Sequence, residues 1–388
     1  MVISLAVKNP CGNHGKLMKR LGKPERNQLK RGSKLRPLQT HRRVVRQAKA
    51  EERRARRRSL AADRLSRSYS ARKIILPNII SLNGSSERAA LLEALRSLRE
   101  HVLNENIATV TIDFSGVRQL LPCGTILLVA ELERLIEDSR YGQKLKAIYP
   151  KDKVVEQLFQ HISILEKLGC KPRIPKIDSE KVIVWLYESG TEGNLDAVVG
   201  SLPALLTSGS NMELRMAVNS GMAEAVANSS EHAYIAKRED GMSIDSPTKW
   251  WLFAKKENDD ISLVICDLGV GIPGSLPTTW GEELESFAKT MIGKKHEDHQ
   301  LIKFAMKLGR SRTNLTHRGQ GLKDILKVVK TQKLGSLGIY SNRGVFNCDG
   351  PTGRTFGCSE PDSILGTVVQ WRVPVKAFNL AGQDGINE

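Results

Sequence analysis

Side chains that could do chemistry gather in the C-terminal half of the chain, and the first group follows helical spacing. Glu224, Asn228 and His232 stand four residues apart within Met222–Tyr234, so they share one face of a helix. A carboxylate, an amide oxygen and an imidazole on one face, with Ala and Val on the other, indicate a polar site lined by that helix. Taken alone, this pattern fits a solvated helix edge better.

A second group lies about thirty residues further on, where a buried strand leads into a glycine-rich turn. Ile261–Pro273 carries Asp267, Gly269 and Gly271 at this turn. The glycines permit positive φ angles and close approach of the backbone to a ligand. At the end of the strand, the Asp267 carboxylate can accept a hydrogen bond from an exocyclic amine.

A third group, Thr316–Leu322, is a glycine-rich loop that precedes a helix predicted at Leu322–Lys330. Such a loop offers amide N–H groups and the positive end of a helix dipole to phosphates. Further on, Gly366-Thr367 opens an alternating strand, Val368–Val373. Each of these glycine motifs is a weak signal by itself, but they occur together and in order.

Hydrophobic periodicity predicts the elements that must position these groups. Lys181–Tyr187 has the pattern of a strand, and Met212–Tyr234 has the composition and spacing of one long helix. The helix would carry the first group, and the strand ending at Asp267 would carry the second.

In this order and spacing, the motifs resemble the Bergerat-fold (GHKL, histidine kinase-like) ATPase superfamily of gyrase, heat-shock chaperones, histidine kinases and mismatch-repair ATPases. The three sequence boxes of that superfamily are matched here by Glu224 and Asn228, by Asp267-x-Gly269-x-Gly271, and by Gly319-x-Gly321. The string EAVANSSEHAY, residues 224–234, is most similar to the anti-sigma-factor serine kinase branch. The resemblance covers about residues 181–375 and implies an α+β two-layer sandwich that binds ATP.

The resemblance also implies roles for the matched residues of the first two boxes. Asn228 would ligate Mg²⁺ through its side-chain oxygen. Glu224 would be the general base that orients water or a partner hydroxyl toward the γ-phosphate. Asp267 would select adenine by its amino group, with Thr367 close to it. A site that binds the nucleotide without turnover is disfavoured, because Glu224 and Asn228 are both present.

The third box implies phosphate contacts. Arg318, or Arg310 or Arg312 just before it, could stabilise charge on the transferred phosphoryl group. The segment Trp280–Thr313 forms a mobile lid in the superfamily, and its histidines are too loosely spaced to predict zinc. Main-chain amides for the phosphates would come from Gly319, Gln320, Gly321 and Leu322.

The preceding segment predicts a separate α/β domain, because strands alternate with helices expected at Ser86–Leu103, Thr125–Asp138 and Val154–Leu168. Residues 110–135 and 145–169 resemble the STAS domain, the fold of anti-sigma-factor antagonists. In that family the turn before the second helix carries Asp-Ser-Ser-Gly, and its first Ser is phosphorylated by a partner kinase. This chain has Leu121-Pro122-Cys123-Gly124 there, and Thr125 is the nearest hydroxyl. The resemblance therefore implies an interaction or sensing module.

The charge of the chain is concentrated at its beginning. Its 388 residues carry a formal net charge of +18. Residues 1–73 hold 23 Lys and Arg against four Asp and Glu, a net of +19, which leaves −1 for the remainder. Thr40–Tyr69 favours helix, and its Arg53–Arg58 run suits phosphates. This basic arm could hold nucleic acid without base-specific readout, bind an acidic partner protein, or be a solvated tail.

The whole sequence is thus predicted to be α/β, without a membrane span or signal sequence, and its scattered cysteines favour reduced thiols in the cytoplasm. The predicted order is a basic arm (1–73), a STAS-like domain (74–170), a linker (171–180), a histidine kinase-like ATPase domain (181–375) and a C-terminal tail (376–388).

Two functions of different class follow. The first is a Mg²⁺-dependent ATPase or Ser/Thr protein kinase of the anti-sigma type, with the STAS-like module regulating it in cis and a protein as substrate. The alternative is an ATP-gated switch for nucleic-acid binding, with slow hydrolysis or none. No segment resembles the phosphoacceptor helix of a histidine kinase, and a homodimer is expected only by analogy.

Overall fold

The chain divides into two compact units, residues 1–68 and 69–388. In the first unit, Glu51, Arg53 and Arg54 are helical and exposed, as the composition of that stretch predicts. The computed structural model describes residues 24, 51, 53–54, 70–138, 140–175, 185–191, 212–240, 248–257, 260–279, 297–308, 325–326, 329–330 and 333–374.

The second unit is a mixed α/β structure that begins with a small parallel sheet in the order β1-β3-β5. The two β-α-β crossovers that parallel strands require pass through α3 and α4. A separate two-stranded ladder joins β2 to β4. The elements of this α3–α4 layer are β1 (Ser70–Ile75), β2 (Ile79–Ile80), α3 (Ser85–Leu103), β3 (Ile107–Asp113), β4 (Gln119–Leu120), α4 (Pro122–Glu137), the 3₁₀ turn η1 (Gly142–Lys144), β5 (Leu145–Ile148), α5 (Lys153–His161) and α6 (Ile164–Lys167).

Three details of the layer differ from the sequence prediction. The strand β1 starts at Ser70, so residues 70–73 belong to the sheet and not to the basic arm, and Lys73 pairs with Asp113 at 2.6 Å. The helix α3 begins at Ser85, one residue earlier than predicted, and Gly84 is its N-cap residue. The third helix is broken, because Ser163 adopts a left-handed conformation between α5 and α6.

The rest of the unit is built on a seven-stranded antiparallel sheet in the order β11-β10-β9-β12-β8-β7-β6. Its long helix, α8, ends two residues earlier than predicted. The elements of this part are β6 (Trp185–Gly190), α8 (Met212–His232), β7 (Trp250–Glu257), β8 (Asp260–Asp267), α9 (Gly271–Thr279), α11 (Asp298–Leu308), β9 (Ser336–Ser341), β10 (Gly344–Asp349), β11 (Thr355–Ser359) and β12 (Thr367–Pro374).

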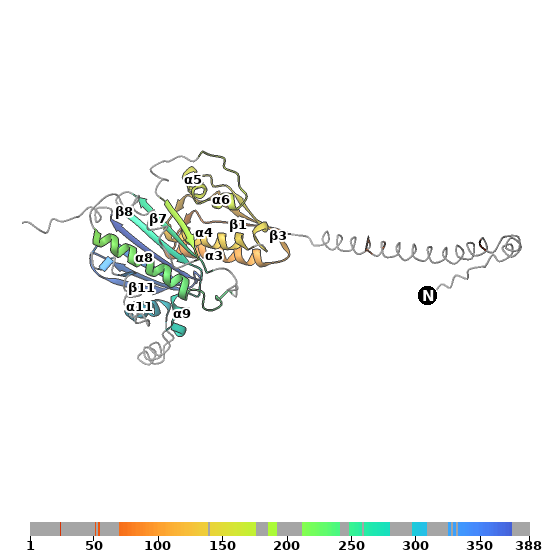
Figure 1. The fold of residues 1–388 in the computed structure, drawn as a ribbon. Helices are drawn as coiled ribbons and strands as arrows, with labels where there is room; N and C mark the ends of the chain where they lie inside the picture. Colours follow the sequence, from red (N-terminus) through yellow and green to blue (C-terminus); the bar gives the residue numbers. More distant parts are fainter. Residues whose placement is uncertain are drawn as a thin grey trace, which may run out of the picture. The chain divides into compact units, whose positions relative to one another are not determined.

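Both faces of the large sheet are apolar, because side chains of its central strands alternate between two buried clusters. In β8, Leu263 and Ile265 belong to one cluster, whereas Val264 and Cys266 belong to the other. The first cluster is completed by α8 and α11, and the second by α3 and α4. Figure 1 shows β7 and β8 with α8 on one side and α4 on the other. The sheet is therefore covered on both faces.

The helix α4 carries a fully buried carboxylate, Glu133, into this contact. Glu133 accepts hydrogen bonds from Trp251 Nε1 at 2.9 Å and from the Tyr187 hydroxyl at 2.5 Å, which bind it to β7 and β6. Lys167 Nζ at 2.5 Å and Lys249 Nζ at 3.1 Å supply opposite charge. Burial alone would raise the pKa of Glu133, but these partners outweigh it and lower the pKa. The layer is thus held by paired charge as well as apolar contact.

The turn at residues 121–124 leads into α4, and Pro122 lies in the first turn of that helix. Cys123 is fully buried, and its Sγ lies 3.8 Å from Asn83 Oδ1, which also accepts from the Tyr340 hydroxyl of β9. Thr125 is buried as well and donates to the Leu121 carbonyl at 2.8 Å. The turn therefore faces the large sheet. Among the described residues, no helix is long and apolar enough to cross a membrane.

Replacing Glu133 with Ala should destabilise the unit by about 3–5 kcal/mol, because Lys249, Trp251 and Tyr187 would lose a buried partner. Glu137→Ala is the matched control: Glu137 lies one turn further along α4 and pairs with Lys249 at a half-exposed position, so its loss should cost about 1 kcal/mol or less. Urea unfolding followed by tryptophan fluorescence measures both. Equal effects of the two substitutions would contradict this account.

Candidate functional site

The polar edge of α8 meets the end of β8 beside the first buried cluster, the one that α8 and α11 complete. Asn228 Nδ2 donates to Glu224 Oε1 at 3.2 Å, so these side chains share one face of the helix, as predicted. The next residue, Ser229, is buried, and its hydroxyl lies 3.5 Å from Asp267 Oδ2. The structure therefore brings the first and second groups together. His232 is the last residue of α8, and no described hydrogen bond joins it to them.

Asp267 is a buried carboxylate with defined donors. Gly269 N–H donates to its Oδ1 at 3.0 Å, and the backbone and hydroxyl of Thr367, its partner on β12, also bond to the carboxylate. Burial raises the pKa of Asp267 to about 6, and the donors Gly269, Thr367 and Ser229 only partly oppose that shift. A carboxylate has about four acceptor positions. Gly269 and the two Thr367 donors occupy three of them, and the Ser229 hydroxyl, whose single hydrogen is closer to the Ala225 carbonyl at 2.9 Å, is the weakest donor to the fourth.

The glycines of the turn are required by packing. A Cβ on Gly269 would overlap the carbonyl of Ala233, which accepts the Val270 N–H at 2.7 Å just after α8. Gly271 has φ +75°, and a Cβ there would lie 2.7 Å from Asn342 Oδ1. These contacts bring the turn against the end of α8 on one side and against the β9–β10 hairpin on the other.

Several residues that hold this turn were missed by the sequence analysis. The Tyr234 hydroxyl accepts the Leu268 N–H at 3.2 Å and donates to the Lys249 carbonyl. Ser341 Oγ accepts the Ile272 N–H at 2.8 Å and lies 3.1 Å from Thr367 Oγ1. Their signal is weak, since serine and tyrosine occur in many contexts. Asn342 was detectable, because Asn in a hairpin turn tolerates positive φ.

The third predicted group cannot be placed beside the first two. Arg318, Gly319, Gln320, Gly321 and Leu322 lie outside the described residues, as do Arg310 and Arg312. Of the predicted lid, only residues 297–308 are described. They include α11, which contacts α9, β10 and β11. His299 of α11 lies 3.1 Å from Ser359 Oγ and 3.2 Å from Glu297 Oε2.

The donor set around Glu224 and Asn228 suits a hard cation shared with a ligand. Asn228 donates to Glu224 through its Nδ2, so this hydrogen bond does not use the side-chain oxygen of Asn228. An oxygen of this kind is the type of ligand that Mg²⁺ prefers. The described residues contain no group of three or more His, Cys, Asp or Glu that could hold a metal by themselves. The set is compatible with Mg²⁺ that takes most of its ligands from phosphates and water.

No protein-family model matches the chain, and no curated protein matches it.

Replacing Asp267 with Asn should stabilise the protein at neutral pH. Because burial raises the pKa of Asp267 to about 6, the folded state binds this proton more tightly than the unfolded state does. Stability is therefore lost as the pH rises from about 4 to about 6, and the loss is complete above that range. Asn does not ionise and so avoids this loss of stability. We therefore expect the free energy of unfolding of Asp267→Asn at pH 7.5 to exceed that of the wild type by up to about 3 kcal/mol.

The advantage should vanish near pH 4, where the native carboxyl is protonated. Asp349→Asn is the control, because the side chain and backbone of Thr352 lower the pKa of this exposed carboxyl. It should give no gain at pH 7.5. Denaturant midpoints of both variants between pH 4 and 8 test the assignment, and a pH-independent gain for Asp267→Asn would refute it.

Proposed function

We propose that residues 181–375 form a Bergerat-type domain that binds ATP with Mg²⁺. The observation that carries the proposal is the buried Asp267 carboxylate at the end of β8, one hydrogen-bond length from the helix that presents Glu224 and Asn228. A buried carboxylate with a raised pKa marks a functional site more often than a structural one. In the two-layer sandwich of that class, α8 and α11 would be one layer and the large sheet the other.

The described residues around the end of β8 and the polar edge of α8 each have a role in this proposal. Asp267 accepts a hydrogen bond from the amino group of adenine, and Thr367 and Ser229 fix the direction of its carboxylate. Asn228 and the nucleotide phosphates would hold Mg²⁺, which neutralises phosphate charge when bound. Glu224, four residues before Asn228, orients the attacking hydroxyl or water and accepts its proton.

Phosphoryl transfer to the chain's own STAS-like turn is disfavoured. Pro122 occupies the acceptor position and has no hydroxyl, and the neighbouring Cys123 and Thr125 are buried against the large sheet. The proposed activity is therefore hydrolysis, or transfer to a hydroxyl of another protein. A switch in which ATP controls the hold of the basic arm on nucleic acid is the second candidate, favoured by the net charge of +19 in residues 1–73.

Glu224→Ala should retain ATP binding and lose at least about a hundredfold in turnover, because it removes the general base. The control is Glu213→Gln, an exposed carboxylate in the first turn of the same helix, about 16 Å away, which should behave as wild type. The assay uses γ-labelled ATP and scores free phosphate and labelled protein, with and without DNA or RNA.

The products separate the functions. Label on a Ser or Thr of an added protein supports the kinase, and free phosphate that rises with nucleic acid supports the switch. A Glu224→Ala variant that turns over as fast as wild type would contradict the catalytic proposal. Asp267→Asn that binds ATP as tightly as wild type would contradict adenine recognition by this residue.

The arm can be tested separately, because β1 begins at Ser70 and residues 1–68 form their own unit. Deleting residues 1–68 should abolish retention on heparin at about 0.15 M salt, since the cations that bind polyanions are removed. ATP affinity should stay within about twofold of the full-length value. A truncated protein that heparin still retains would place the polyanion site in the second unit.

A further inference from the structure

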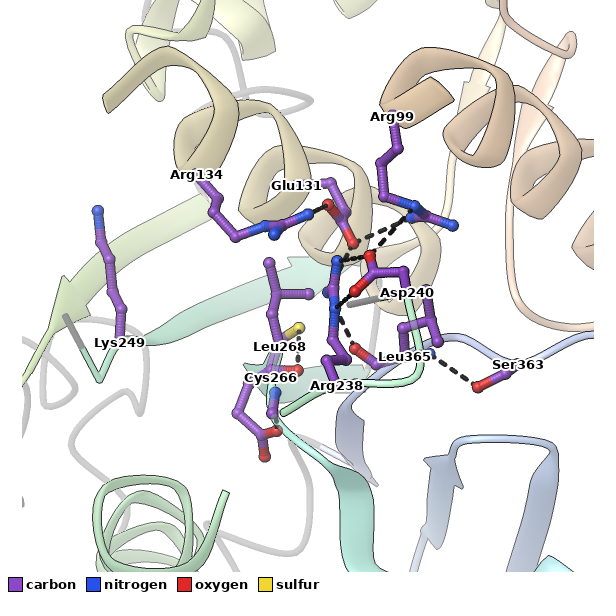
Figure 2. Close-up of polar contacts among 12 residues, drawn as sticks. Arg99, Glu131, Arg134, Arg238, Asp240, Lys249, Cys266, Leu268, Ser363 and Leu365 are labelled. Atoms are coloured by element: carbon purple, nitrogen blue, oxygen red, sulfur yellow. Dashed lines mark hydrogen bonds and ion pairs between the residues drawn. The ribbon is translucent and has the colours of Figure 1, made fainter. Parts of the chain in front are cut away.

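Two buried arginines connect the α3–α4 layer to the turns that frame Asp267. The first, Arg238, follows α8 by six residues and is almost fully buried. Its Nη1 donates both to Glu131 Oε1 of α4, at 2.9 Å, and to the Leu365 carbonyl, at 3.2 Å. Figure 2 shows the Arg238 side chain between Glu131 and Leu365, with Asp240 beside it. One guanidinium thus joins α4 to the segment before β12.

Leu365 adopts a backbone conformation that a non-glycine residue rarely keeps. Its φ is +57°, in the left-handed region, and such a conformation persists only when the surroundings hold it. Arg238 binds its carbonyl, and Ser363 Oγ accepts its N–H at 3.1 Å. Thr367, which donates to Asp267, is only two residues further on.

The second arginine, Arg88 of α3, binds the hairpin on the other side of the same site. Its Nη2 donates to the carbonyls of Asn342, at 3.1 Å, and Asp362, at 3.2 Å. Asn342 also has a left-handed φ, +52°. Its side-chain amide donates to the Val270 carbonyl at 2.8 Å, in the glycine turn, and its N–H donates to Gly366 at 3.1 Å. The two arginine contacts therefore converge on the turns beside Asp267.

In the Arg238–Glu131 contact, each charged side chain also has other partners of opposite charge. Glu131 also accepts from Arg99 at 3.1 Å and from Arg134 at 2.6 Å, and Arg238 also pairs with Asp240. Burial would raise the pKa of Glu131, but Arg134, Arg238 and Arg99 outweigh it and keep the carboxylate ionised. Loss of Arg238 would thus leave Glu131 with two cationic partners, so this link can be cut without stranding a buried charge.

We propose that Arg238 and Arg88 are positioning residues through which the α3–α4 layer fixes the base-binding end of the nucleotide site. The inference rests on the proposed function for the ligand, but the contacts themselves do not. Because binding energies are linked, contacts of the layer that raise nucleotide affinity are themselves tightened by bound nucleotide by the same factor. The layer then sets the affinity of the site through these contacts, without phosphorylation.

Arg238→Gln tests the link, and Arg99→Gln is its matched control. Arg99 is a buried arginine that pairs with the same carboxylate and with Asp240, and neither of these contacts involves the turns. Affinity for ATP, measured by calorimetry, should fall about tenfold in Arg238→Gln and less than about twofold in Arg99→Gln, although both lower the melting temperature. Arg238→Lys, which keeps a donor, should recover part of the affinity. Arg88→Gln should weaken binding as Arg238→Gln does.

A second readout needs no nucleotide. Amide hydrogen exchange at Gly269, Val270 and Thr367 should be faster in Arg238→Gln than in wild type, and unchanged in Arg99→Gln. If wild type fails to bind ATP while exchange responds as stated, the proposed function is wrong and the positioning role stands. If affinity and exchange change equally in the two variants, following stability alone, the positioning role is overturned.

Discussion

The large sheet has two apolar faces, and the rest of the structure depends on covering both. Strand β7 shows the constraint most directly: Trp250 and Leu252 enter one buried cluster, and Trp251 and Phe253 enter the other. At about 25 cal/mol per Å² of apolar area, exposing either face would cost many times the few kcal/mol that separate folded from unfolded protein. Helices α8 and α11 cover one face, which leaves α3 and α4 to cover the second. The α3–α4 layer is therefore part of the fold of its neighbour.

This arrangement gives the two faces different tasks. On the α8 face, a helix edge and a strand end bring together a carboxylate, an amide and a buried Asp. On the α4 face, Glu131 and Glu133 bind charged and aromatic partners on the sheet side. The turns at Leu365 and Asn342 lie where the faces meet, and both have left-handed backbones. The candidate site and the charged contacts of the α3–α4 layer thus lie on opposite faces of one sheet and are connected at its edge.

Much of this could be predicted from sequence. Helical and alternating periodicities located α3, α4, α8, β8 and β12 within a few residues. Asp267 lies beside Thr367 and is reached from α8, the helix that carries Glu224 and Asn228, through Ser229. The packing of the two parts could not be predicted from local pattern, because it pairs residues far apart in the chain. One signal was present: Trp250–Ala254 is an unbroken apolar run, which indicates a strand buried on both faces. A second signal in the sequence was the presence of two glutamates, Glu131 and Glu133, within an otherwise apolar helix.

The placement of Glu131 and Glu133 also has a consequence for biosynthesis. Arg238 follows Glu131 by 107 residues, and Trp251 follows Glu133 by 118. At roughly 5–20 residues per second, a ribosome would complete α4 about 5 to 25 seconds before the strands that cover it. During that interval the apolar side of α4 has no sheet to cover it. The hydrated carboxylates within this helix oppose association with other nascent chains, and they become interior hydrogen-bond acceptors only when the later segments of the chain arrive. The same two groups that join the finished layers thus protect the unfinished one.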